Sequence, residues 1–152
     1  MNRYRKLFEE ALERYSAELG AEIKWCRGGC GTYKSQEPGT THSKYGGFAT
    51  WRKDGAPTVH CGAEMATRAT LHLGLHEIAH LVLGHCDRTE KGNRKSRQRV
   101  YEREAAAEKW ADQRLRELGV PVPRKTRQLG KDYVARKKRR GDRVIAGRRK
   151  AG

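Results

Sequence analysis

Two histidines four residues apart, with a glutamate directly after the first, form the most informative chemical pattern in this chain. They are His76, Glu77 and His80, an HExxH motif in a segment whose apolar spacing predicts a helix. Residues i and i+4 lie one helical turn apart, so both imidazoles can reach one metal ion. Glu77 would then stand beside a water molecule on that ion, as zinc hydrolysis requires. The motif therefore predicts a zinc site with Glu77 as the general base.

A catalytic zinc ion usually takes three protein ligands, so the third must come from outside the motif. Glu104 is the best candidate, because the three alanines at 105–107 would let its helix pack close to the zinc-bearing one. Glu108 and His85 are the alternatives, although His85 follows His80 too closely for the longer three-histidine signature. Otherwise we expect Glu108 to hydrogen-bond the outer nitrogen of a ligating histidine, and His85 to cap the helix or support the ligands from behind.

The segment around these residues resembles a known family. His76 to His85, followed by Glu104-x-x-Ala107-x-x-Trp110-Ala111, is similar to the ImmA/IrrE-type zinc metallopeptidases. These are small cytoplasmic gluzincins that are common in phages, mobile elements and bacterial stress switches. The resemblance covers about residues 45–123.

The resemblance implies an α+β, zincin-like fold. It has a small twisted antiparallel or mixed sheet, the HExxH helix and a following helix that bears a ligand. By position, His76, His80 and Glu104 would bind one catalytic Zn²⁺ and Glu77 would be the base. The zinc ion would lower the pKa of its water to roughly 7, and Glu77 would pass the proton to the leaving amine.

Two further parts of such a site are left open by the residues. Tyr101, His60 and Tyr45 are candidate donors to the carbonyl oxygen that becomes negatively charged, and the sequence does not choose among them. In zincins a strand that precedes the zinc helix often forms the edge on which the peptide lies. Here that role would fall to the expected strand at about 57–61.

Apolar periodicity predicts the elements that carry the site. Helices are expected at about 4–19, 67–83 and 99–118, because apolar residues recur there at three- and four-residue spacing. The Asp-Gly pair at 54–55 predicts a hairpin between strands at 47–52 and 57–61, and a short strand is expected at 21–25. A basic helix is expected at 125–140.

Charge divides the chain into two parts. The 152 residues carry a formal net charge of +16, and 13 of the 34 Lys and Arg but only 2 of the 18 Asp and Glu lie in 124–152. We therefore expect a metallopeptidase domain at 1–123 and a basic C-terminal tail at 124–152. Lys137, Lys138, Arg139 and Arg140 are the candidate nucleic-acid contacts, to phosphates rather than to bases. The alternative is a solvated extension that aids solubility.

The absence of apolar segments and the four cysteines bear on the cellular location of the protein. There is no apolar signal-peptide core and no run long enough to cross a membrane, so the expected location is the cytoplasm, that of a bacterial host if the protein is phage-encoded. Cys26, Cys30, Cys61 and Cys86 are then expected to be thiols, with a second structural zinc site as the alternative.

The favoured function is that of a zinc metallopeptidase acting on an intracellular protein or peptide. The rival is a zincin-fold nucleic-acid-binding or anti-restriction accessory protein without proteolysis. A phage structural or packaging component is the third candidate.

Overall fold

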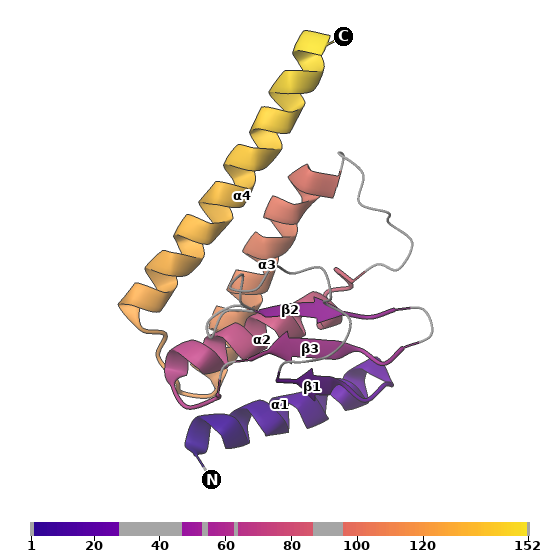
Figure 1. The fold of residues 1–152 in the computed structure, drawn as a ribbon. Helices are drawn as coiled ribbons and strands as arrows, with labels where there is room; N and C mark the ends of the chain where they lie inside the picture. Colours follow the sequence, from indigo (N-terminus) through magenta and orange to yellow (C-terminus); the bar gives the residue numbers. More distant parts are fainter. Residues whose placement is uncertain (1, 28–46, 53–54, 63, 87–95, 152) are drawn as a thin grey trace.

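The computed structural model describes residues 2–27, 47–52, 55–62, 64–86 and 96–151, and these form four helices and three short strands (Figure 1). In chain order the elements are α1 (Arg3–Leu19), β1 (Lys24–Cys26), β2 (Gly47–Thr50), β3 (Thr58–Cys61), α2 (Arg68–Val82), α3 (Ser96–Glu117) and α4 (Arg124–Ala151). The prediction of an α+β chain with a small mixed sheet is confirmed.

The sheet has the order β1-β3-β2. β3 is parallel to β1, with Val59 opposite Trp25, and antiparallel to β2, with Val59 opposite Ala49. The predicted antiparallel pair is thus present, and its tip at 53–54 lies outside the described residues. β3 has neighbours on both sides and cannot be the edge strand expected at 57–61. Among the described strands, the edge next to α2 and α3 is β2.

The apolar core lies where α1 and α2 meet the sheet. Phe8 of α1 is fully buried and contacts the ring of Trp25 edge to face, with 5.0 Å between the ring centroids. Gly74 of α2 permits this packing, because a Cβ there would come within 2.5 Å of Phe8 and 2.8 Å of Met65. One side of α2 is therefore fixed by close apolar contact.

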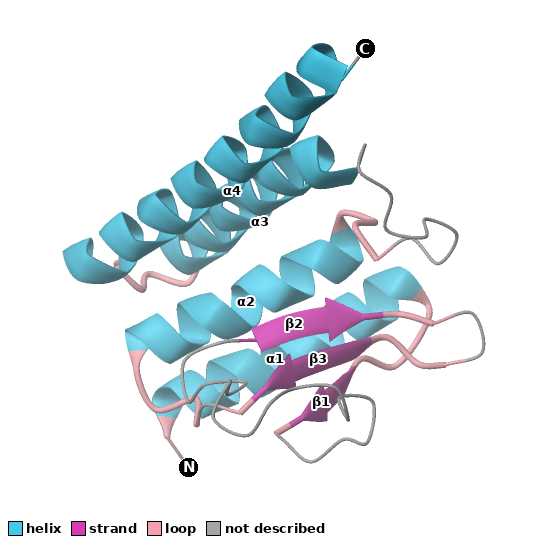
Figure 2. Ribbon diagram, turned by 45° about the horizontal axis from the view of Figure 1, so that its top comes forward, coloured by secondary structure: helices cyan, strands magenta, loops and turns pink. Residues whose placement is uncertain are grey.

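The opposite side of α2 faces α3. Figure 2 shows α2 between the sheet and α3, with α4 lying along α3 in the opposite direction. Ala107, Ala111 and Leu115 of α3 are fully buried, and Val120 and Val122 of the connector are also buried. Of the three alanines expected to let α3 pack closely, only Ala107 is buried, whereas Ala106 is exposed. The connector after α3 is part of the interior.

α4 is longer than expected and belongs to this arrangement. It runs from Arg124 to Ala151, beyond the predicted end at 140. Gly130 lies against the carboxylate of Glu108, because a Cβ at Gly130 would be 2.5 Å from Glu108 Oε2. The proposed boundary at 123/124 stays a prediction, but the helix beyond it lies directly on α3.

Candidate metal centre

His76 and His80 lie on the α3 side of α2, one turn apart. A Thr67–Thr70 capping box fixes the start of this helix, and both Thr side chains bond the backbone there. The two Nε2 atoms lie 3.1 Å apart, and His76 is only 5% exposed. Helical spacing thus places the buried imidazole of His76 and the partly buried imidazole of His80 around one point, as the motif predicts.

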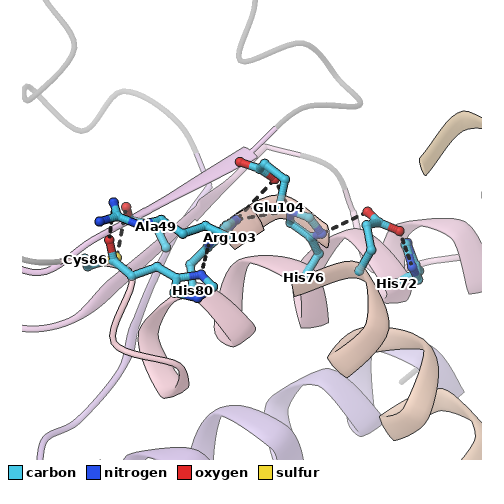
Figure 3. A network of polar contacts seen from close by, with 9 residues as sticks. Ala49, His72, His76, His80, Cys86, Arg103 and Glu104 are labelled. Carbon is cyan, nitrogen blue, oxygen red and sulfur yellow. Dashed lines mark hydrogen bonds and ion pairs between the residues drawn. The ribbon is translucent and has the colours of Figure 1, made fainter. Parts of the chain in front are cut away.

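Glu104 of α3 completes the group (Figure 3). Its Oε2 atom is 2.9 Å from His76 Nε2 and 3.4 Å from His80 Nε2. In a tetrahedral zinc site with bonds of about 2.0–2.2 Å, neighbouring ligand atoms lie about 3.3 Å apart. The three donor atoms have this spacing, and all lie within 4.8 Å of one another. These buried His and Glu side chains could therefore hold a metal ion.

The charges of these side chains couple α2 to α3. Burial alone would lower the pKa of His76, but the adjacent carboxylates of Glu104 and Glu108 raise it to about 10. The pKa of Glu104 falls well below its usual range, because hydrogen bonds with His76 and His80 outweigh the effect of its burial.

The outer nitrogens of both histidines also have polar neighbours. His76 Nδ1 is 2.9 Å from Glu108 Oε1, an ion-pair distance at an angle outside that of a well-directed hydrogen bond. His80 Nδ1 is 3.0 Å from His85 Nδ1. Burial and the nearby His80 lower the pKa of His85 to about 4, so His85 is neutral and its Nδ1 can accept a hydrogen bond from the Nδ1–H of His80. Both Nε2 atoms are thereby left for a metal ion, and Glu108 and His85 lie behind the ligands rather than among them.

Glu77 is buried beside this group, with 4% of its surface exposed. Burial raises the pKa of Glu77, and the neighbouring His76 and His80 partly oppose that shift. Gly47, the first residue of β2, lies directly on it: a Cβ at this position would come within 3.2 Å of Glu77 Cγ and 2.8 Å of the His60 carbonyl oxygen. A carboxylate with a raised pKa, pressed against a strand edge, is suited to general-base chemistry.

A pocket of about 620 Å³ opens over these side chains. β2 contributes Phe48 and Ala49 to its wall, and α4 contributes Leu129, Tyr133 and Arg136. Its floor holds the donor residues and Glu77. The pocket therefore lies between the sheet edge and α4, with mostly apolar walls above a polar floor, as in many ligand sites.

Tyr133 was not among the expected donors. Burial and the negative charges of nearby Glu104 and Glu77 raise its pKa, so its hydroxyl stays protonated beside the donor group. His60 instead pairs with Thr50 at 3.0 Å, and neither it nor Tyr101 lines the pocket. Tyr45 lies outside the described residues. A single tyrosine in a highly basic helix gives no pattern that sequence reasoning could have used.

The described cysteines do not form the alternative zinc site. Cys26 is disulfide-bonded, so the expectation of a thiol there is wrong, while Cys61 and Cys86 are thiols. Cys30 lies outside the described residues. Burial raises the pKa of Cys86 to about 11, and its thiol donates to the Ala49 carbonyl at 3.5 Å. A four-thiolate site is excluded because Cys26 cannot supply a thiolate.

The four basic residues proposed as nucleic-acid contacts lie together on α4. Lys138, Arg139 and Arg140 are exposed, and Lys137 is half-buried with its ammonium 5.2 Å from the centre of the Tyr133 ring. Lys138 lies over the Tyr101 ring at 5.8 Å. Arg139 and Arg140 are therefore exposed to solvent, while the ammonium groups of Lys137 and Lys138 lie over aromatic rings.

No helix in the described parts of the chain has the length and apolar character needed to span a bilayer. In comparisons with known proteins, no family model, curated protein or solved structure matches this chain.

Proposed function

We propose that this protein is a zinc-dependent metallopeptidase of the zincin type, similar to the ImmA/IrrE family, that hydrolyses a peptide bond in an intracellular protein. The observation that carries the proposal is the convergence of His76 Nε2, His80 Nε2 and Glu104 Oε2 within 4.8 Å, beside a buried Glu77. Two imidazoles and one carboxylate form a well-known donor set for catalytic zinc. Zn²⁺ held there would supply Lewis acidity, which activates water and polarises the scissile carbonyl.

Glu77 and Tyr133 would carry out proton transfer and stabilisation of the carbonyl oxygen. Glu77 takes a proton from the attacking water and delivers it to the nitrogen of the leaving amine as the C–N bond breaks. The raised pKa of Glu77 supports this role, because a stronger base takes the proton more readily. Tyr133 donates its hydroxyl hydrogen to the carbonyl oxygen as negative charge develops there.

The edge of β2 supports binding of an extended substrate. β2 pairs only with β3 among the described strands, and its residues Gly47, Phe48 and Ala49 line the pocket. A peptide strand added at this edge would pass over Glu77 with its backbone hydrogen-bonded and alternate side chains directed into the pocket. Gly47 has no side chain to obstruct that approach.

Replacing Glu77 with Gln tests the proposal. We expect Glu77→Gln to bind zinc like the wild type and to lose about 10²- to 10⁴-fold in hydrolysis of a fluorescence-quenched peptide library. Glu102→Gln makes the same chemical change at an exposed position of α3 and should leave the rate unchanged. Equal rates for wild type and Glu77→Gln would exclude Glu77 as the base and, with it, this mechanism.

A nucleic-acid contact is the second candidate function, favoured by the exposed charges of α4. Lys138, Arg139 and Arg140 occupy consecutive positions. Each phosphate that a basic side chain neutralises makes the DNA-binding constant fall more steeply with salt, by about 0.9 in the slope of log K against log salt concentration. We expect replacing all three with Ala to weaken duplex DNA binding and reduce that slope, measured by fluorescence anisotropy. Glu77→Gln serves as the control, since it should leave DNA binding unchanged.

A further inference from the structure

The donor residues described above belong to a longer row of side chains. His72, His76 and His80 follow one another at four-residue intervals along α2, and Figure 3 shows them in line. Three acidic residues of α3 at the same intervals face them: Glu104, Glu108 and Asp112. The proposed peptidase site uses one end of this row. His72 and Asp112, at the other end, take no part in its mechanism.

The far end repeats the geometry of the first group. His72 Nε2 lies 3.3 Å from Glu108 Oε2 and 3.2 Å from Asp112 Oδ1, and the three donor atoms all lie within 4.8 Å of one another. The edge of a tetrahedral zinc site is about 3.3 Å. The second group therefore has the separations expected for ligands of a shared cation.

Hydrogen bonding does not account for this packing. His72 is 5% exposed, and neither its Nε2 nor Asp112 Oδ1 makes a well-directed hydrogen bond within the described part of the chain, although the two atoms are 3.2 Å apart. Leaving buried polar atoms unsatisfied costs about 1–3 kcal/mol each. A cation placed between the two atoms would satisfy both.

We propose that His72, Glu108 and Asp112 form a second site for a divalent transition-metal ion of the Zn²⁺ class. One imidazole nitrogen and two carboxylate oxygens suit such an ion better than Mg²⁺ or Ca²⁺, which prefer oxygen ligands alone. With three donors of net charge −2, the site neutralises a dication and needs no further protein ligand. The competing explanation is a protonated His72 held between two carboxylates, with no metal ion.

Glu108 links the second site to the first. Its Oε2 faces His72, and its Oε1 lies 2.9 Å from His76 Nδ1, on the far side of the ring from Glu104. A cation at the second site would draw electron density from Glu108 and so weaken the support that this carboxylate gives His76. Binding at the two sites is therefore coupled, and the coupling acts equally in both directions.

Counting zinc ions on the full chain tests the second site. The protein is stripped with a chelator, titrated with ZnCl₂ and analysed by native mass spectrometry. We expect two zinc ions on the wild type and one on Asp112→Asn or His72→Ala. Asp132→Asn, the same chemical change at an exposed position of α4, should keep two.

Removing a ligand from each end separates this inference from the peptidase proposal. His80→Ala should retain one ion, because His80 has no part in the second group, and the double variant His72→Ala/His80→Ala should bind none. Asp112→Asn keeps the shape of the side chain, so it still tests the second site if His72→Ala fails to fold. One ion on the wild type, or two on Asp112→Asn, would overturn the second site while leaving the HExxH site and its activity intact.

Discussion

α2 carries an apolar face toward α1 and the sheet and a polar face toward α3. On the first, Gly74 lies against Phe8 and Met65 in a dry, close-packed contact. On the second, every fourth residue is a histidine opposite a carboxylate, and the distances are set by charge rather than by shape. The apolar face of α2 therefore contributes mainly to stability, and its polar face carries the candidate metal ligands. We expect substitutions on one face to have little effect on the other.

The apolar face should show the largest effect on stability. Phe8→Ala removes a fully buried ring from above Gly74 and should lower the free energy of unfolding by about 3–5 kcal/mol in urea titrations. The folded fraction should still bind zinc with wild-type stoichiometry, since no donor residue contacts this side. Leu118→Ala, at a position 38% exposed, should change stability by no more than about 0.5 kcal/mol. Loss of zinc from folded Phe8→Ala would show that the two faces are not independent.

The polar face should show the opposite result. Tyr133→Phe removes one hydroxyl at the pocket wall and should lower kcat by about 10²- to 10³-fold, because that donor acts on charge present only in the transition state. KM and the thermal midpoint should change little. Tyr101→Phe is the matched change outside the pocket and should leave kcat unaltered. If the two variants had the same kcat, Tyr133 would not be the donor.

Two glycines of α4 test whether this helix lies on α3: Gly130 is in contact with Glu108, and Gly147 has no close neighbour. Gly130→Ala would force a methyl group to within 2.5 Å of Glu108 Oε2, and such overpacking costs about 1–3 kcal/mol. Gly147→Ala has nothing within 4 Å and should instead gain about 0.5–1 kcal/mol from helix propensity. Thermal unfolding of both variants measures the difference. A stabilising Gly130→Ala would mean that α4 does not lie on Glu108 in solution.

The sequence was sufficient for those parts of the site that helical periodicity governs. Four-residue spacing placed His76 and His80 on one face, and small residues after Glu104 indicated the close approach of its helix. The same spacing extends to His72 and to Asp112, each four residues beyond a recognised site residue. That signal was present but unused, because neither residue belongs to the motif.

Long-range placement could not be predicted in the same way. No pattern in a three-residue strand tells whether β1 pairs in parallel with β3 or where β2 joins the sheet. The sequence predicted a basic helix at 125–140 within a basic tail, and nothing in it placed that helix on α3. α4 lies directly on α3 where Gly130 meets Glu108, and this contact depends on the shape of α3 rather than on the hydropathy of α4.

The position of α4 in the chain affects when the pocket can form during translation. The ribosome makes the HExxH helix and α3 first, and the wall bearing Tyr133 emerges only afterwards. A nascent chain can thus gather its metal donors while one side of the pocket is still missing. The complete pocket, and any binding that needs its α4 wall, is therefore delayed until this later helix has left the exit tunnel.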